Sequence, residues 1–346
     1  MKRRIYFVHS WVHDIDSFLE YTDLNLEDGV ELVWDEKEPE ILFGSDNIYT
    51  NRECNKVFRK LYEKARVTVF YGTEACFTDF NLFDYGLGYD NTIKYNRYVQ
   101  IPIERFYRKM FNDEPINIEE ATNLLNKNGS VKFCNFLYSN PFAHPFRDKL
   151  FYAISDYKHV DSLGKHLNNT GRGGTGFVGH YQDMVALKRG YKFSIAVENI
   201  KFPGWTSEKI YTSLNAHTIP IYWGNPDVEF EINPNCLINC MKYNSIEDII
   251  EEIRRIDNDD EAWIQMVSSP WHTPEQLKYL ENRSKEYDRF MNDILIKPIE
   301  EIKQRRIGTY QWYYRNWFLQ TKIDMSFWTR LKRRLKNNAE NPVREL

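Results

Sequence analysis

Three stretches decide the fold: YKFSIAVEN (residues 191–199), GWTSEKI (204–210) and NAHTIPIYWGNP (215–226). The first and the third contain apolar runs that are typical of buried strands. The residues between them, 207–216, predict a helix. A strand, a helix and a strand in this order are typical of a parallel sheet, in which neighbouring strands end at the same edge.

The start of this helix predicts a phosphate site. Ser207 stands at the expected N-cap, so the amides that follow it point toward the loop. These N–H groups, the positive end of the helix dipole and the cation of Lys209 all favour a bound anion. At the carboxyl edge of a parallel sheet, this is where a nucleotide lies. The alternative is an ordinary surface helix with an exposed pair of Glu208 and Lys209.

The rest of the chain alternates short apolar runs with amphipathic stretches, the pattern of an α/β protein. Further strands are expected at residues 5–8, 30–34, 41–43, 67–71 and 132–138, and further helices at 53–65, 147–157 and 245–256. Two such series, joined near residues 113–128, predict two Rossmann-like domains that face a cleft. We expect these domains at residues 1–125 and 126–300, followed by a helical tail at 301–346.

Composition narrows the class of protein. The chain has 346 residues, enough for two domains, and 42% hydrophobic residues, which argues against extended disorder. A net charge of −4 excludes a polyanion binder built on overall charge. The five cysteines are scattered and predict neither a disulfide scaffold nor a zinc site, so we expect a reducing compartment.

Localisation is predicted from both ends of the chain. The apolar run after the basic start, residues 5–8, is too short for a signal peptide, and we expect a cytoplasmic protein.

The C-terminal region has a basic composition. From residue 301 onward, the chain has eleven Lys and Arg but only four Asp and Glu, and aromatic residues are interleaved with them. This composition is typical of a helix lying on an anionic lipid surface, here the inner membrane. The alternative is that residues 310–318 pack on the body and only the end is a solvated basic tail. Nothing else in the sequence favours nucleic acid binding.

The three stretches quoted first closely resemble the donor-binding signature of glycosyltransferase family 10, the α-1,3/α-1,4-fucosyltransferases. The resemblance extends over residues 131–240 and includes VDSLGKHLNNTG, residues 160–171. FYGTEACFTDFNLFDYGLGYD, residues 70–90, resembles the bacterial members. The resemblance implies a GT-B fold of two Rossmann-like domains, with GDP-β-L-fucose bound by the C-terminal one and the acceptor held by the N-terminal one.

The implied reaction is an inverting displacement of GDP by an acceptor hydroxyl, which needs a carboxylate base and cations for the leaving diphosphate. Glu74, three residues after the expected strand end at Tyr71, matches the base of the bacterial family pattern. Asp79 and Asp84 are the alternatives, and Asp84 is expected to be structural.

The resemblance also assigns the donor site. Lys209 matches the lysine that meets the phosphates, and Glu208 the neighbouring acid that contacts fucose or balances charge. A second cation is expected at Lys165, where related sequences often carry Arg, or at Arg172 just downstream. Lysine supplies the charge but not the bidentate fork of arginine.

Three further residues complete the implied donor site. Glu198 and Asn199 match the pair at the strand end that faces guanosine or fucose hydroxyls, and Trp205 takes a position usually filled by an aromatic residue. Glu198 as a buried structural carboxylate and Trp205 as ordinary core remain open alternatives.

No metal site is predicted. The histidines lack ligand spacing, and the acidic run at residues 257–260 is interpreted as a solvated turn between helices. A phosphate-neutralising lysine replaces a metal, so no cofactor is expected.

We expect an inverting bacterial α-1,3-fucosyltransferase that transfers L-fucose to the GlcNAc of an N-acetyllactosamine-type glycan, giving a Lewis-x-like product on surface glycans. The alternatives are another linkage (α-1,4), another nucleotide sugar, or a non-catalytic glycan-binding relative.

Overall fold

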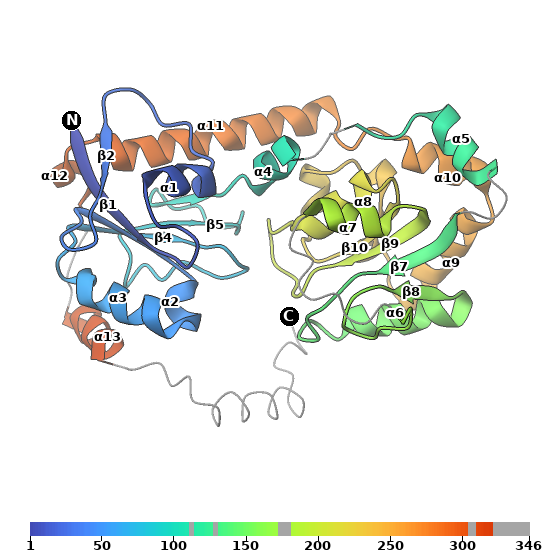
Figure 1. Ribbon diagram of the computed structural model, residues 1–346, viewed down its shortest axis with the longest axis horizontal. Coiled ribbons are helices and arrows are strands. Elements are labelled where there is room, and N and C mark those ends of the chain that lie inside the picture. Colours follow the sequence, from blue (N-terminus) through green and yellow to red (C-terminus); the bar gives the residue numbers. More distant parts are fainter. Residues whose placement is uncertain (111–113, 127–130, 172–180, 304–308, 321–346) are drawn as a thin grey trace. The chain divides into compact units, whose positions relative to one another are not determined.

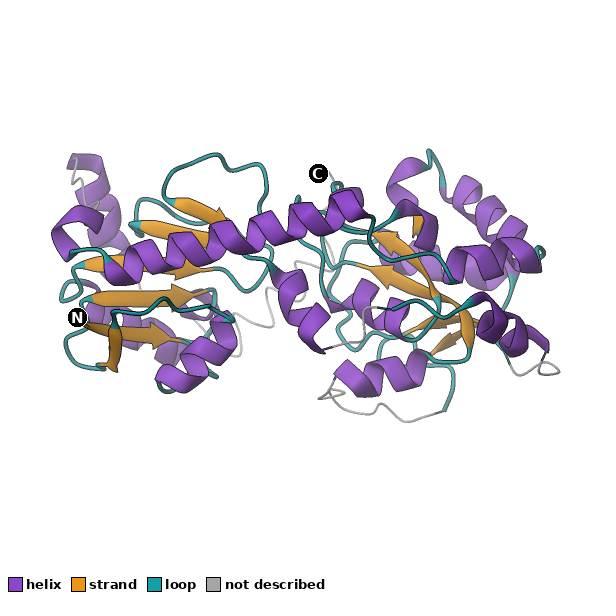
Figure 2. Cartoon of the chain, turned by 90° about the horizontal axis from the view of Figure 1, so that it is seen from above, coloured by secondary structure: helices purple, strands orange, loops and turns teal. Residues whose placement is uncertain are grey.

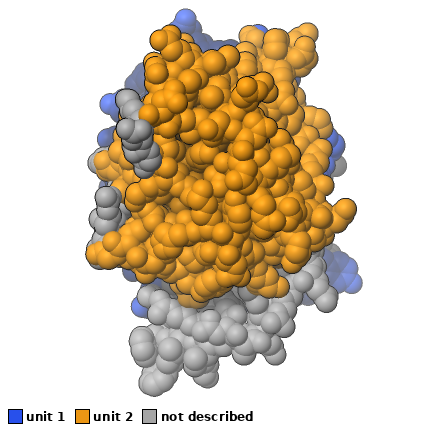
Figure 3. Space-filling view, turned by 90° about the vertical axis from the view of Figure 1, so that its right-hand side faces the viewer, with its two compact units in different colours: residues 1–102, 282–342 blue, residues 103–281, 343–346 orange. Residues whose placement is uncertain are grey.

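The computed structural model describes residues 1–110, 114–126, 131–171, 181–303 and 309–320. Two compact units divide the chain, coloured separately in Figure 3. Unit 1 consists of residues 1–102 together with the described residues from Asn282 onward, and unit 2 of residues 103–281. The expected boundaries were 1–125, 126–300 and 301–346. The structure instead divides the chain after Pro102 and after Glu281, which lies within the long helix α11 (Pro274–Ile296).

Unit 1 contains a parallel six-stranded sheet with the strand order β2-β1-β3-β4-β5-β6. The strands are β1 (Lys2–Val8), β2 (Glu31–Trp34), β3 (Ile41–Ser45), β4 (Val67–Tyr71), β5 (Tyr85–Gly88) and β6 (Tyr98–Gln100). Its helices are α1 (Ile15–Thr22), α2 (Asn47–Thr50), α3 (Arg52–Tyr62), α12 (Ile299–Ile302) and α13 (Thr309–Gln320), with the end of α11.

Helices cover both faces of this sheet, with α1 and α11 on one face and α2, α3 and α13 on the other (Figure 1). On the first face Phe43 packs against Phe18 of α1, with ring centroids 5.1 Å apart. On the second face Phe70 and Phe58 both pack against Phe83.

The C-terminal part of α11 belongs to unit 1 because hydrogen bonds tie it there. The Tyr287 hydroxyl donates to the Thr22 carbonyl (2.7 Å), and the buried Arg3 guanidinium donates to the Leu295 carbonyl (2.9 Å).

Unit 2 contains a parallel five-stranded sheet with the order β11-β10-β9-β7-β8. The strands are β7 (Lys132–Phe136), β8 (Val160–Ser162), β9 (Tyr191–Val197), β10 (Ile219–Trp223) and β11 (Ile238–Asn239). Its helices are α4 (Ile103–Met110), α5 (Ile118–Asn126), α6 (Phe146–Tyr157), α7 (Tyr181–Lys188), α8 (Glu208–Asn215), α9 (Ile246–Asp257) and α10 (Asp260–Val267), with 3₁₀ turns η1 (Val228–Phe230), η2 (Pro234–Cys236) and η3 (Cys240–Lys242).

This sheet is also covered on both faces, by α6, α9 and α10 on one side and by α7 and α8 on the other (Figure 1). Figure 2 shows helices on both sides of the strands in each unit. Phe136, Phe193 and Ile221 belong to the core beneath α6, α9 and α10. Ala196 and Tyr222 point the other way and pack with Tyr211 of α8. Alternation of side chains along each strand produces the two cores.

Both sheets have the same winding. In each unit the second strand lies outside the first, and the third pairs with the first on its other side. The winding therefore reverses between β1 and β3 in unit 1 and between β7 and β9 in unit 2. In doubly wound sheets, ligands bind outside the carboxyl ends of the strands at this switch point. The expected α/β class with two Rossmann-like domains is confirmed.

All five cysteines are free thiols. Within the described ranges, no helix combines the length and the apolar character that a membrane crossing requires.

Candidate active site

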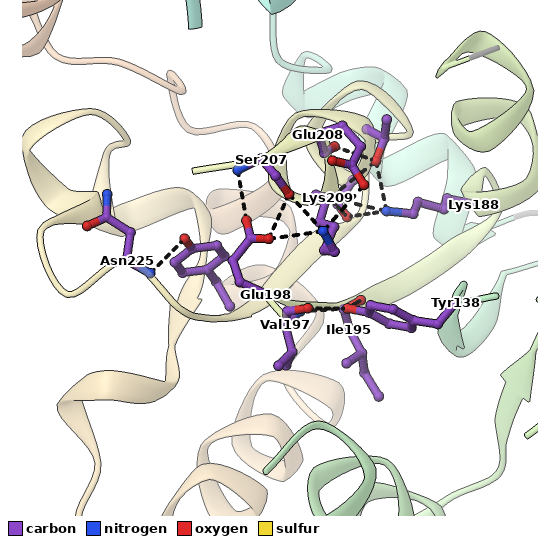
Figure 4. Close-up of polar contacts among 12 residues, drawn as sticks. Tyr138, Lys188, Ile195, Val197, Glu198, Ser207, Glu208, Lys209 and Asn225 are labelled. Atoms are coloured by element: carbon purple, nitrogen blue, oxygen red, sulfur yellow. Dashed lines mark hydrogen bonds and ion pairs between the residues drawn. The ribbon is translucent and has the colours of Figure 1, made fainter. Parts of the chain in front are cut away.

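The centre of the site is the carboxylate of Glu198, directly after β9 at the switch point of unit 2. Its side chain is fully buried. Oε1 accepts a hydrogen bond from the Ser207 backbone N–H (2.8 Å), and Oε2 accepts from the Ser207 hydroxyl (2.7 Å) and the Lys209 ammonium (3.0 Å) (Figure 4). Glu198 therefore fixes the loop that begins α8.

The glycine after β10 makes room for this carboxylate. Gly224 has a φ of +151°, and a Cβ there would lie 2.4 Å from Cγ of Glu198. The next residue, Asn225, holds the loop before α8: its side chain accepts from the Gly204 N–H (2.8 Å) and donates to the Thr206 hydroxyl (2.9 Å). Gly224 and Asn225, near the end of the third quoted stretch, thus support Glu198 and the loop before α8.

Ser207 occupies the N-cap of α8, as predicted, but its side chain makes no capping hydrogen bond. The hydroxyl is directed to Glu198 instead. Because the cap side chain is used elsewhere, the first-turn amides of α8 keep their capacity to bind an anion.

Lys209 is a cation whose ammonium is fixed by hydrogen bonds. Its Nζ also donates to the Ser207 hydroxyl (2.9 Å) and lies 3.4 Å from Glu208 Oε1 and 5.9 Å from the Trp205 ring centroid. Burial lowers the pKa of Lys209, but the carboxylates of Glu198 and Glu208 outweigh burial and hold it above its usual value. The Lys209 side chain keeps 14% of its surface exposed, and its ammonium is held beside the first turn of α8.

The two acids of the cluster differ. Burial raises the pKa of Glu198 above its usual value, against the opposing effect of Lys209. Burial also acts on Glu208, but Lys209 and hydrogen bonding with Ser207 outweigh it and lower its pKa. Glu208 keeps about a quarter of its side chain exposed (26%), so it is the acid that a ligand can reach.

Other predicted donor residues lie at the same edge of the sheet. Trp205 is buried beside Lys209. Asn199 is half-buried, and its carbonyl accepts from the His144 N–H (2.7 Å). Lys165 is exposed in the loop after β8, and the next residue, His166, donates its N–H to the Tyr138 carbonyl (2.9 Å). Arg172 lies outside the described residues.

Arg147 is a buried cation that was not predicted from the sequence. It lies in the first turn of α6, is only 1% exposed, and has its guanidinium carbon 4.7 Å from the Tyr138 ring centroid. Nε donates to Asp148 (3.2 Å), whereas Nη1 has no hydrogen-bond partner among the described residues. A buried unsatisfied donor is costly, so Nη1 is a candidate donor to a bound anion.

Tyr138 is close enough to both cations for their charges to affect its hydroxyl. Its hydroxyl accepts from the Val197 N–H (2.7 Å) and so joins the ends of β7 and β9. Burial raises the pKa of Tyr138, and the positive charges of Lys209 and Arg147 both oppose that rise. Arg147 could have been found from the sequence, because it stands in the first turn of a helix, where the helix dipole disfavours a cation.

Glu74 lies at the carboxyl edge of the sheet in unit 1. It follows the end of β4 at Tyr71 by three residues, as predicted, and its side chain is exposed. The preceding Thr73 donates its N–H to Asp46 (2.9 Å), which fixes the loop beside the end of β3.

The two alternative carboxylates have other partners. Asp84 is buried and accepts from the Thr68 N–H (2.8 Å) and hydroxyl (3.0 Å), which confirms its structural role. Asp79 accepts from the Tyr314 hydroxyl of α13 (2.6 Å).

Within the described ranges, no group of three or more His, Cys, Asp or Glu side chains is arranged to hold a metal ion. The acidic run at 257–260 spans the end of α9 and the start of α10, and the interpretation as a solvated turn is wrong for Asp257. That side chain is buried and pairs with Lys158 (2.8 Å), while Asp259 caps α10.

Comparison with known proteins assigns this sequence pattern to a family. Residues 127–307, just over half of the chain, match glycosyltransferase family 10 (fucosyltransferase) C-term. The chain is 27% identical over 250 residues to the α-(1,3)-fucosyltransferase FucT of Helicobacter pylori, across 63% of this chain and 50% of that protein. It is 26% identical over 182 residues to an α-(1,4)-fucosyltransferase of Arabidopsis thaliana, across 49% and 44%. The chain thus spans about half the length of these relatives.

The fold is similar to that of a crystal structure of an α1,3-fucosyltransferase with GDP-fucose. The TM-score is 0.59 at 21% sequence identity, covering 86% of this chain and 93% of that chain.

Proposed function

Since the chain belongs to glycosyltransferase family 10, the fucosyltransferase family, we propose that it is an inverting fucosyltransferase that uses GDP-β-L-fucose. One observation carries the proposal. The buried carboxylate of Glu198, the start of α8 without a side-chain cap, and the ammonium of Lys209 lie together at the switch point of unit 2. The similar α1,3-fucosyltransferase structure named above contains GDP-fucose, which supports this choice of donor.

In this proposal the donor diphosphate lies at the first turn of α8. Its oxygens accept from the helix amides, from Lys209 and from the unsatisfied Nη1 of Arg147. These groups stabilise the negative charge that grows on GDP as the bond to fucose breaks. Glu198 takes no part in the chemistry and holds Ser207 and Lys209 in place. Glu208, with its lowered pKa, remains ionised and balances positive charge developing on the sugar.

Glu74 is the proposed base. Its exposed carboxylate takes the proton of the acceptor hydroxyl, whose oxygen attacks the anomeric carbon of fucose while GDP departs from the opposite face. One displacement inverts the β-linked donor to an α-linked product. The exposure of Glu74 supports this choice over Asp84, which is buried, and Asp79, which bonds α13.

For the acceptor we propose the GlcNAc of an N-acetyllactosamine-type glycan on a bacterial surface polysaccharide, joined by an α-1,3 linkage. The Helicobacter pylori relative, an α-(1,3)-fucosyltransferase, supports this linkage. The plant relative is an α-(1,4)-fucosyltransferase and keeps that linkage as the second candidate.

The test is incubation with GDP-fucose and a panel of Galβ1-4GlcNAc and Galβ1-3GlcNAc acceptors, followed by linkage analysis. Fucose on the 3-hydroxyl of GlcNAc in the first acceptor is the expected result. Transfer only to the 4-hydroxyl in the second would favour the α-1,4 linkage. Calorimetry with GDP and UDP distinguishes the donor, and binding of neither nucleotide would overturn the proposal.

The proposed location is the cytoplasmic side of the inner membrane, with contact through the C-terminal region. On α13, Tyr314 and Arg315 face the body, where Arg315 donates to the Asn81 carbonyl (2.9 Å). The same helix leaves large aromatic side chains exposed: Tyr310, Trp312, Tyr313 and Trp317. Such residues insert at the headgroup level of a bilayer.

Vesicle flotation tests this location. The full chain is expected to float with vesicles that contain anionic lipid, and the double variant Trp312→Ser/Trp317→Ser to float less. Equal flotation of both proteins, or none with anionic vesicles, would contradict it.

A further inference from the structure

Lys188, the last residue of α7, is a buried lysine that the proposed mechanism does not use. It is only 4% exposed. Its Nζ donates to the Lys209 carbonyl (3.1 Å), the Thr212 hydroxyl (2.9 Å) and the Ser213 hydroxyl (3.0 Å), all on α8 (Figure 4). All three acceptors are neutral. Among the residues that the structure describes, no carboxylate forms an ion pair with this amine.

These bonds place the amine within the helix that starts the phosphate site. Thr212 also donates to the Glu208 carbonyl (2.7 Å). The Ser213 hydroxyl donates to the Lys209 carbonyl (2.7 Å) and lies 3.0 Å from the Ser194 hydroxyl of β9. Lys188 therefore connects α7 to both α8 and the central strand. The residue whose carbonyl it contacts, Lys209, is the one whose ammonium meets the ligand in the proposed function.

The charge of Lys188 is sensitive to its surroundings. Burial lowers its pKa to about 7, and the like charge of Lys209 acts in the same direction. The charged groups that face it are Glu208 and Lys209 from α8 and Glu198 from the end of β9, and the two carboxylates raise the pKa. Both carboxylates are shared with Lys209, so they compensate burial only in part.

We propose that Lys188 is a positioning residue that takes up a proton when the donor diphosphate binds, so that a second buried cation supports the start of α8. The inference rests on the proposed function, because it needs a diphosphate at that helix start. A nearby negative charge favours the ionised form of a lysine. The proton comes from solvent and is retained on Nζ, where all three N–H groups already have acceptors.

The sign of the effect follows from linkage. Below the pKa of the free protein, Lys188 is charged with or without donor, and binding moves no proton. Between that value and the higher pKa of the complex, binding takes up a proton, so donor affinity falls as the pH rises. A structural lysine that stays neutral, or one that stays charged, gives neither effect.

The experiment is titration calorimetry of the full chain with GDP-fucose and no acceptor, at about pH 8, in buffers of different ionisation enthalpy. GDP-fucose is the probe because its diphosphate has no proton that titrates near neutrality. The expected result is uptake on the order of half a proton per donor bound, falling toward none at about pH 5.5.

Three variants assign the proton. Lys188→Met should bind donor without uptake, and Lys188→Arg should bind without uptake while keeping its affinity at alkaline pH, because an arginine stays charged. Lys278→Met, which changes an exposed lysine of α11, should retain the uptake of the wild type.

The outcomes are separable. Donor binding in the wild type without uptake at about pH 8, or with equal uptake at both pH values, would overturn the inference while leaving the proposed function standing. Uptake that persists in Lys188→Met would overturn it as well. If the wild type binds no GDP-fucose, the proposed function fails and this inference fails with it. The comparison of the two pH values uses the wild type alone, so it stands even if Lys188→Met does not fold.

Discussion

At the scale of single residues, the site depends on charges held in unusual surroundings. Glu198 is buried and satisfied by Ser207 and Lys209, whereas Arg147 is buried with one nitrogen unsatisfied. Removing one partner of a buried pair strands the other charge, which costs about 3–5 kcal/mol. Substitutions at Glu198 are therefore expected to affect folding, and function is better tested at Arg147 and Glu74.

Arg147→Met is expected to weaken GDP binding at least about tenfold, because a charge-assisted hydrogen bond to phosphate is lost. Guanosine, which has no phosphate, should bind the variant as it binds the wild type. Titration calorimetry with both compounds measures the difference. An equal loss for guanosine and GDP would show that Arg147 only supports the fold.

Glu74→Gln is expected to lower the turnover number by about 10²- to 10⁴-fold with GDP binding intact, because the amide cannot accept the acceptor proton. The matched control is Asp79→Asn, which changes a carboxylate in the same loop and should retain turnover within a few-fold. Steady-state rates of GDP release decide between them. Near-normal turnover of Glu74→Gln would make another group the base.

Sequence reasoning reached part of this site. Glu198, Glu208 and Lys209 belong to a local motif, and a local motif can be recognised along the chain. Arg147 and Lys188 were not predicted, because the pattern of each helix does not show that these positions are buried, although a cation in a first turn was a signal for Arg147. Their roles depend on contacts with Tyr138 and with α8, which only the packed structure brings together.

At the scale of elements, strands with continuous apolar runs could be predicted closely. The expected strands at 67–71 and 191–197 coincide with β4 and β9. The helix expected at 245–256 is α9, and Ser245 and Asp248 form the capping box at its start. The short strands β5, β6 and β8 were missed, because three or four residues carry too little periodicity to stand out from a loop.

Gly224→Ala is expected to reduce donor affinity strongly, because the added methyl group would displace the Glu198 side chain and with it the start of α8. Gly29→Ala is the matched control: its φ of +101° is also positive, but a Cβ there meets nothing within 4 Å. Both variants carry backbone strain of about 1 kcal/mol or more, so thermal unfolding should change for both and GDP affinity for Gly224→Ala alone. Loss of affinity in both would indicate a general effect of instability.

At the scale of the whole molecule, two sheets of the same winding carry different chemistry. The groups proposed to bind the donor lie at the carboxyl edge of the sheet in unit 2, and the proposed base lies at the carboxyl edge in unit 1. The division into two Rossmann-like units could be predicted from the repeated series of strands and helices. That the chain returns to unit 1 from Asn282 onward could not be predicted, because this depends on contacts such as that of Arg3 with Leu295.

Fucosyl transfer is expected to continue in EDTA at close to the untreated rate, because Lys209, Arg147 and the start of α8 supply the positive charge for the leaving diphosphate. Product formation with and without chelator measures this, and a chelated sample with added Mg²⁺ is the control. Loss of activity in EDTA that Mg²⁺ restores would contradict the prediction.

The boundary inside α11 has a consequence for biosynthesis. A ribosome releases residues 103–281 before the segment that completes the first sheet's helical cover, which holds Tyr287 and Leu295. Because domains generally fold as units during translation, the middle of the chain can mature while its beginning still waits for a partner. A nascent chain halted near residue 281 would therefore lack the segment that covers Tyr71 through Tyr287, and we expect chaperones to bind this state.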